Sequence, residues 1–242
     1  MRPNLRKFVV ASALFVFAAC SGSEPAPDAE DTIEEAIVAP NDATSEITTP
    51  QVKPGAEAFK IVMLGDSLTA GFELPPSQAL PAEIERLLKS AGHSIDVINA
   101  GVSGDTSAGG LARYDWSVAS ANPDMLILAL GANDYLGGID PDQTKDNLTA
   151  IIERASSDDV EILLVSVSAR SSAASDPRAA VFAEIYPDLA ETYEIALYSG
   201  LVDPIFDQPN LLMQDGLHPT AEGIRNIAPP LSAAIAEFLK SN

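Results

Sequence analysis

Apolar runs of four to six residues alternate with longer amphipathic stretches from residue 61 onward. Most of these runs lack the strict polar alternation of a strand with one solvated face, so they predict strands buried on both faces of a sheet. Met125–Leu130 is the most continuous run and predicts the central strand. The five predicted strands are Ile61–Leu64, Ile95–Ile98, Met125–Leu130, Ile162–Val167 and Ile195–Tyr198.

Helical stretches separate these strands. We expect Pro187 to kink or end the fourth helix and Pro229-Pro230 to interrupt the last one, because proline lacks a backbone N–H and clashes with the preceding turn. The alternation of strands and helices predicts an α/β fold with a five-stranded parallel sheet covered on both faces. The predicted helices are Leu80–Ser90, Ser107–Ser120, Asp142–Ala155, one that begins at Asp176-Pro177, and one that runs from Thr220.

Residues 1–19 have the features of a secretory signal peptide. Three basic residues precede the apolar run Phe8–Phe17, which is too short to span a bilayer stably, and two alanines come directly before Cys20. Cys20 is the only cysteine in the chain, so an intrachain disulfide is excluded. Its position resembles the lipobox of bacterial lipoproteins, in which the cysteine becomes the lipidated N-terminus. The alternative is ordinary cleavage and release of a soluble periplasmic or secreted protein.

Residues 20–57 differ in composition from the rest of the chain. They contain five prolines among many acidic and small residues and almost no aromatic ones, so they cannot bury a core. We expect a disordered tether between a lipid anchor on Cys20 and a single domain over residues 58–242, although a loop without a role fits the same composition. Ser21, rather than Asp, follows Cys20, which favours the outer membrane if the host is Gram-negative.

The formal net charge of the chain is −21. Because nucleic-acid binding needs a basic patch to neutralise phosphates, this balance argues against a nucleic-acid partner. High acidity is typical of a well-solvated protein surface.

Four short polar motifs follow one another down the chain, and three of them come directly after predicted strands. In parallel sheets, ligands bind beyond the carboxyl ends of the strands, so the motifs are expected to meet at one edge of the sheet. The last motif lies in the long connection after the fifth strand. The motifs are Gly65–Leu68, Gly101–Asp105, Gly131–Asp134 and Asp215–Pro219.

Together the motifs contain the groups that serine acyl hydrolysis needs. Ser67 follows the first strand at a turn into a helix, a position that exposes a nucleophile, although a serine there can also cap the helix. His218 is one of two histidines, and the other, His93, is expected on the surface between a helix and a strand. His218 is therefore the candidate base, and Asp215 can orient its ring by accepting from the second nitrogen.

Three groups can donate hydrogen bonds to the negative charge that develops on the carbonyl oxygen. They are the backbone N–H groups of Ser67 and Gly104 and the side-chain amide of Asn133. Gly104 can also be a turn glycine with positive φ, and Asn133 can be a turn former after its strand.

Three aspartates flank the motifs and raise the alternative of a metal site. Asp66, Asp105 and Asp134 lie on separate loops and lack the spacing of metal ligands. We expect them to cap helices or brace loops.

These residues resemble the SGNH/GDSL hydrolase superfamily, whose Ser, Gly, Asn and His are matched by Ser67, Gly104, Asn133 and His218. The longer stretches 65–71 and 103–107 look like its bacterial arylesterase, thioesterase I and lysophospholipase branch. The resemblance implies a flavodoxin-like three-layer α/β/α sandwich, an acyl-enzyme on Ser67, and no metal or organic cofactor. It implies small substrates, namely acyl esters, thioesters or lysophospholipids. The alternatives are a carbohydrate O-deacetylase of exported glycans and a non-catalytic surface lipoprotein.

The chain departs from that branch at two places. Tyr135 follows the Asn-Asp pair where small residues are common, and we expect its ring at the pocket mouth or on the loop surface. Ser168–Ser175 stands where relatives tend to carry a short Pro-containing apolar segment. That segment is either a flexible loop or part of a remodelled pocket wall.

Overall fold

The structure is a computed structural model that describes residues 57–166 and 177–241. The predicted signal peptide, Cys20 and all but the last residue of the predicted tether lie outside the described residues, as does the Ser168–Ser175 segment. No helix in the described ranges combines the length and the apolar character needed to cross a membrane.

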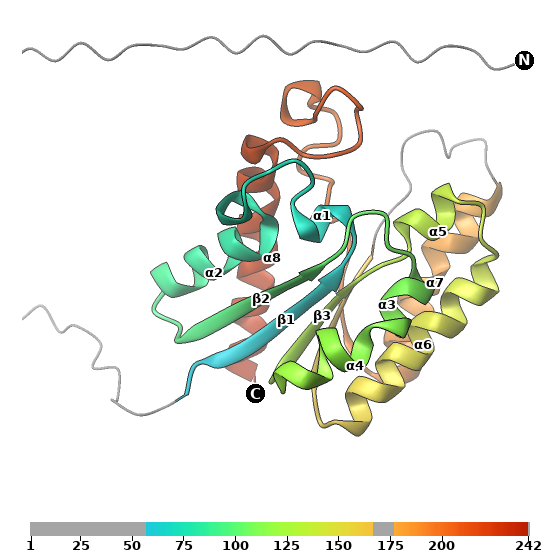
Figure 1. Cartoon of the computed structure of the whole chain (residues 1–242), viewed down its shortest axis with the longest axis horizontal. Coiled ribbons are helices and arrows are strands. Elements are labelled where there is room, and N and C mark those ends of the chain that lie inside the picture. The colour runs from blue at the N-terminus through green and yellow to red at the C-terminus, as the bar shows by residue number, and fades with distance from the viewer. Residues whose placement is uncertain (1–56, 167–176, 242) are drawn as a thin grey trace, which may run out of the picture. The chain divides into compact units, whose positions relative to one another are not determined.

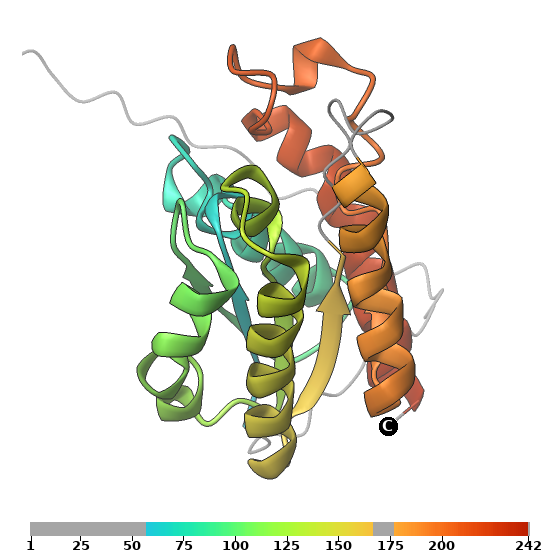
Figure 2. The same ribbon diagram turned by 90° about the vertical axis from the view of Figure 1, so that its right-hand side faces the viewer.

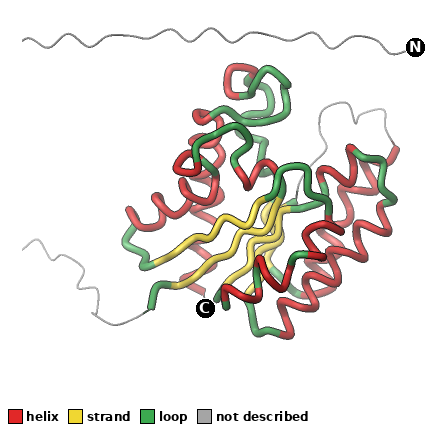
Figure 3. The backbone as a smooth tube through the Cα atoms, in the orientation of Figure 1, coloured by secondary structure: helices red, strands yellow, loops and turns green. Residues whose placement is uncertain are grey.

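Five parallel strands form one sheet in the order β2-β1-β3-β4-β5 (Figures 1 and 3). All five predicted strands are present, and β3 is central as predicted. The register pairs Gly65 with Gly101 on one side and with Ala129 on the other, so β1, β2 and β3 end at the same edge. The strands are β1 (Phe59–Gly65), β2 (Ile95–Gly101), β3 (Met125–Ala129), β4 (Glu161–Val165) and β5 (Ala196–Tyr198).

Helices cover both faces of the sheet and make a three-layer α/β/α sandwich (Figures 1 and 2). Their bounds are α1 (Ser67–Ala70), α2 (Leu80–Ser90), α3 (Ser107–Ala112), α4 (Tyr114–Ser117), α5 (Ala132–Leu136), α6 (Pro141–Ser157), α7 (Pro177–Tyr193) and α8 (Ala221–Ser241), with 3₁₀ turns at Pro76–Gln78, Ala119–Ala121 and Pro209–Leu211.

Each face of the sheet has its own hydrophobic core, because successive side chains of a strand point to opposite faces. Ile61 and Met63 pack with buried residues of α2 and α8 on one face. Val62 and Leu64 pack on the other face with buried residues of α4, α6 and α7. The two cores hold the strands in register and so fix where their carboxyl ends meet.

Pro187 does not end its helix, and Pro229-Pro230 do not interrupt theirs, so these two predictions are wrong. Helix α7 continues through Pro187, and α8 continues through Pro229 and Pro230. All three prolines are exposed, and so are the residues four positions earlier, whose carbonyls lose their helical partners. Water can therefore satisfy those carbonyls, while the opposite side of each helix stays packed on the sheet.

The predicted helix over Ser107–Ser120 is instead two short helices with a break at Arg113. Gly109 and Gly110 weaken helix formation in this stretch. A side chain at either position would meet a neighbouring side chain closely, the Asp105 carboxylate at Gly109 and the end of Leu130 at Gly110.

Candidate active site

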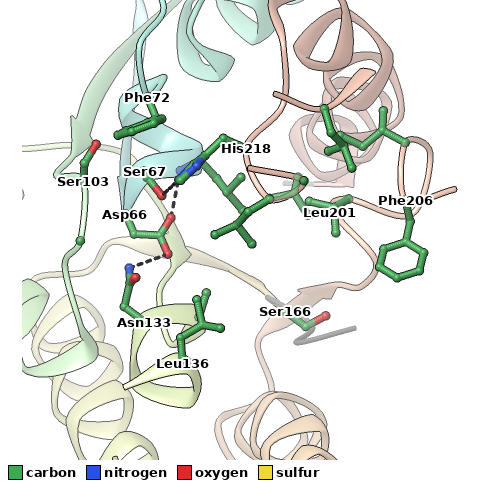
Figure 4. A pocket seen from close by; sticks show the side chains of 18 residues that line it. Asp66, Ser67, Phe72, Ser103, Asn133, Leu136, Ser166, Leu201, Phe206 and His218 are labelled. Carbon is green, nitrogen blue, oxygen red and sulfur yellow. Dashed lines mark hydrogen bonds between the residues drawn. The ribbon is translucent and has the colours of Figure 1, made fainter. Parts of the chain in front are cut away.

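Ser67 is the first residue of α1, directly beyond the end of β1. Asp66 caps this helix, because its Oδ1 accepts a hydrogen bond from the Leu68 N–H at 3.0 Å. The helix ends after one turn at Gly71, whose φ of 77° is a left-handed conformation that suits glycine. The capping role expected for Ser67 as an alternative therefore belongs to Asp66, and the Ser67 hydroxyl points into a cavity (Figure 4).

His218 bonds both predicted partners through its two ring nitrogens. Its Nε2 lies 2.9 Å from Ser67 Oγ, and its Nδ1 lies 2.6 Å from Asp215 Oδ2. Asp215 Oδ1 also accepts the backbone N–H groups of Leu217 and His218, at 2.9 and 3.0 Å. These bonds, above all that to the imidazole, lower the pKa of the Asp215 carboxyl to about 2. The carboxylate is thus held in its charged form.

A closed turn carries the Asp215–His218 pair. Leu212 and Pro219 form an antiparallel bridge at its base, and the Met213 N–H donates to the His218 carbonyl at 2.7 Å. The turn restrains a histidine that lies 151 positions from the serine it contacts.

Gly104 and Asn133 reach the same cavity as Ser67 from the ends of β2 and β3. Gly104 has a φ of 83°, so the turn-glycine role is present whether or not its N–H also serves a substrate. The Asn133 amide nitrogen donates to the Asp105 carbonyl at 2.9 Å and makes a longer contact of 3.4 Å with Asp66 Oδ2. The Asp105 carbonyl therefore holds the Asn133 amide firmly, and the contact with Asp66 is the weaker of the two.

The three flanking aspartates brace this edge of the sheet, as expected. Besides capping α1, Asp66 is buried next to His218, and burial raises the pKa of its carboxyl to about 6. Asp105 pairs with Arg113 at 2.6 Å. Asp134 is fully buried and accepts from the Ser107 N–H at 2.8 Å and from the hydroxyls of Ser107 and Thr144.

The cavity beside Ser67 has a volume of about 640 Å³ and a largely apolar wall. Leu201 and Phe206 lie across the cavity from Ser103 (Figure 4). Four apolar lining residues come from the turn after β5, which sequence patterns did not single out. The apolar lining residues are Leu68, Phe72, Leu136, Leu201, Val202, Ile205, Phe206, Leu212 and Leu217.

Tyr135 is not at the pocket mouth, and it is not a surface loop residue. It lies on helix α5, which sequence patterns missed, and it is only 8% exposed. Its ring packs edge-on against Phe182 at 5.3 Å between centroids, and the Arg178 guanidinium lies over it at 5.3 Å. In this helix it is the next residue, Leu136, that lines the cavity and is 55% exposed.

Phe72 is a functional neighbour that sequence reasoning missed. Its ring stacks on the His218 imidazole with centroids 4.1 Å apart and planes 24° from parallel. The stack restrains the imidazole from the side that neither Ser67 nor Asp215 contacts. The signal available in the sequence was an aromatic residue directly after Gly71, the glycine that ends the serine-bearing helix.

The sequence model of the GDSL-like lipase/acylhydrolase family matches residues 63–225, a span that includes all four motifs. An arylesterase from Vibrio mimicus is 32% identical over 166 residues, which cover 67% of this chain and 81% of that enzyme. Thioesterase 1/protease 1/lysophospholipase L1 from Escherichia coli strain K12 is 32% identical over 167 residues, 69% of this chain and 78% of the relative.

Solved structures of other proteins have a similar fold. AlinE4, an SGNH-hydrolase family esterase, aligns with a TM-score of 0.62 and 36% sequence identity. The alignment covers 76% of this chain and 98% of AlinE4. The family match extends from within β1 to the start of α8 and includes every residue that lines the cavity with Ser67.

Proposed function

Because this chain belongs to the GDSL-like lipase/acylhydrolase family and is a serine carboxylic ester hydrolase, we propose that Ser67, His218 and Asp215 form its catalytic triad. The observation that carries the proposal is the bridging imidazole, which bonds Ser67 through Nε2 and Asp215 through Nδ1. A serine-directed phosphonate tests the assignment, since it should label Ser67 alone.

The geometry supports the following reaction. Ser67 Oγ attacks the carbonyl carbon of an ester or thioester while His218 Nε2 accepts its proton. Asp215 accepts the Nδ1 hydrogen, which keeps Nε2 free as an acceptor and stabilises the imidazolium. His218 then gives its proton to the leaving alcohol or thiol, and the acyl group stays on Ser67. Water then attacks the acyl group on Ser67 by the same steps, with His218 as the base, and the acid leaves.

The oxyanion donors in this proposal are the backbone N–H groups of Ser67 and Gly104 and the Asn133 amide. All three residues line one cavity. Donors of this kind act on charge that is present mainly in the transition state, so they raise kcat more than they strengthen substrate binding.

We propose that the substrates carry an apolar acyl chain, as in aryl esters, acyl thioesters or lysophospholipids. Relatives are named as arylesterase and as thioesterase and lysophospholipase, and the cavity wall beside Ser67 is largely apolar. A carbohydrate O-deacetylase would bind a polar ring and only a methyl-sized acyl group, so this wall does not favour that alternative. Membership of a hydrolase family whose named relatives are esterases does not favour the alternative of a non-catalytic lipoprotein.

The chain-length profile tests the acyl-binding role of the cavity. Burying each added methylene is worth about 0.8 kcal/mol, which corresponds to about fourfold in kcat/KM, so we expect the rate to rise from acetate to medium-chain p-nitrophenyl esters. Val202→Phe, which adds bulk to the apolar wall, should remove this rise while acetate hydrolysis stays within about twofold.

Val181→Phe is the matched control, because Val181 is 52% exposed on α7 and does not line the cavity. It should leave the profile unchanged. If the Val202→Phe and wild-type profiles run parallel, the acyl chain binds elsewhere.

We also propose that the protein is exported with residues 1–19 as its signal peptide and is held at the membrane by lipid on Cys20. The basic start, the apolar run and the alanines before Cys20 support this proposal. Two or more acyl chains anchor firmly, whereas one binds only marginally. Cys20→Ser should therefore move the protein from the membrane fraction to the soluble exported fraction with its specific activity unchanged. Soluble wild-type protein would contradict the anchor.

A further inference from the structure

Arg113 is a buried arginine at the break between α3 and α4, with a side chain only 8% exposed. Its guanidinium donates to four acceptors at once. Nε bonds Asp105 Oδ2 at 2.6 Å, and Nη2 bonds the Gly65 carbonyl at 3.0 Å. Nη1 bonds the Ala100 carbonyl at 2.7 Å and Ser117 Oγ at 3.1 Å. A planar fork with five N–H groups is the side chain that can hold such a divergent set.

Three of these acceptors are connected to the three proposed oxyanion donors, two through a short stretch of chain and one through a further hydrogen bond. The Gly65 carbonyl lies at the end of β1, two residues before Ser67. The Ala100 carbonyl lies one residue before the end of β2, four residues before Gly104. Asp105 links to the third donor, because its own backbone carbonyl accepts the Asn133 amide at 2.9 Å.

A second observation is that the residues around Arg113 accommodate the positive charge of its guanidinium. The Asp105 carboxylate occupies space that a side chain on Gly109 would fill. It is only 15% exposed and offsets the buried positive charge. The Gly65 carbonyl also accepts the Val102 N–H at 3.1 Å, so the first two loops are bonded to each other where the guanidinium holds them.

We propose that Arg113 is a positioning residue that sets the relative positions of the three oxyanion donors. The proposal rests on the proposed function, because it needs Ser67, Gly104 and Asn133 to act on one substrate oxygen. Donors on three separate loops must meet within about 0.5 Å of the productive geometry. Arg113 bonds the ends of β1 and β2 and the Asp105 carboxylate directly, and it reaches the Asn133 loop through Asp105, whose backbone carbonyl accepts the Asn133 amide. Arg113 does not line the cavity, so in this proposal it does not contact the substrate.

Arg113→Lys is the direct test. Lysine keeps the positive charge and can still pair with Asp105, but its ammonium lacks the fork that reaches two diverging carbonyls. We expect kcat for a p-nitrophenyl ester to fall by roughly 10- to 100-fold. This fall is smaller than the loss of about 10²–10³ in kcat when one oxyanion donor is removed, because the donors would be displaced and not lost. KM should stay within about twofold. Arg154→Lys is the matched control, because Arg154 pairs with exposed Asp115 on the surface, and its kcat should equal that of wild type.

A double-mutant cycle with Asn133→Ala separates positioning from general weakening of the fold. If Arg113 acts through the donors, Arg113→Lys should cost much less in kcat once Asn133 is already alanine, so the double loss is smaller than the product of the single losses. A double loss equal to that product, or an effect on KM alone, would overturn the proposal.

Ser117→Ala gives a second route if Arg113→Lys does not fold. It removes only the 3.1 Å bond to Nη1 and leaves every bond to the strand ends in place. We expect kcat to fall about two- to fivefold at constant KM. If Arg113→Lys does not fold and Ser117→Ala has the kcat of the wild-type protein, the proposal is overturned. Failure of the proposed function gives a different result. An active Ser67→Ala variant would disprove the triad. An inactive Ser67→Ala variant, together with fully active Arg113 and Ser117 variants, would disprove only the role of Arg113.

Discussion

Ser67→Ala is expected to lower kcat for ester hydrolysis by about 10⁶, the loss typical when the nucleophile of a triad hydrolase is removed. The Ser67 hydroxyl faces the cavity and bonds only the His218 imidazole at 2.9 Å among the described contacts. Its removal takes no apolar group from either core of the sandwich. The variant should therefore unfold at the temperature of the wild-type protein, and the loss should be one of chemistry alone.

Phosphonate labelling followed by peptide mass spectrometry provides the second readout. The wild-type protein should carry one label, on the peptide that contains Ser67, and the variant should carry none. Ser120→Ala serves as the control, because Ser120 is an exposed serine whose hydroxyl donates to the Trp116 carbonyl, away from the cavity. A label on another serine, or turnover retained by the Ser67 variant, would remove Ser67 from the mechanism.

The positions of Ser67, Gly104 and Asn133 could be anticipated from the sequence because all three follow the ends of predicted strands. Continuous apolar runs identified the strands, and parallel pairing brings their carboxyl ends to one edge. Ser67, Gly104 and Asn133 accordingly line one cavity with His218, and Asp215 bonds His218 from behind. His218 and Asp215 lie in the long connection after β5, so they were anticipated from their chemistry and not from a strand end.

The parts that were missed depend on which side of an element faces the core. Pro187, Pro229 and Pro230 interrupt no helix because each lies on a solvent side, which proline itself does not reveal. Tyr135 was misplaced because α5 is only five residues long, too short for a helical period to show. On that helix Tyr135 faces the core, and Leu136 faces the cavity.

The cavity wall was missed for a related reason. The turn after β5 supplies Leu201, Val202, Ile205 and Phe206, and its sequence has neither a strand nor a helix period. Leu201 and Ile205 are also buried in the core, so the same side chains pack the fold and line the cavity. Tertiary structure was required to show that these residues line the same cavity as Ser67.

Asp215→Asn is expected to lower kcat by about 10⁴, the loss measured for this change in a serine protease triad. Two backbone N–H groups bond Asp215 Oδ1, so the oxygen of an asparagine amide would occupy that place. The amide nitrogen would then face His218 Nδ1 and donate to it. That bond fixes the hydrogen of the neutral ring on Nε2, where it blocks acceptance of the Ser67 proton.

Asp215→Ala distinguishes this cause from simple loss of orientation. Alanine removes the bond to Nδ1 without imposing the wrong tautomer, and the Phe72 stack still restrains the ring. The asparagine variant should therefore be at least as slow as the alanine variant, even though it preserves more of the native contacts. The measurement is kcat for both variants at one pH on the alkaline side of neutrality, with thermal unfolding to confirm the fold. If asparagine restores most of the activity that alanine loses, then Asp215 acts mainly by holding the turn, and the charge that its pKa of about 2 preserves is not what the reaction uses.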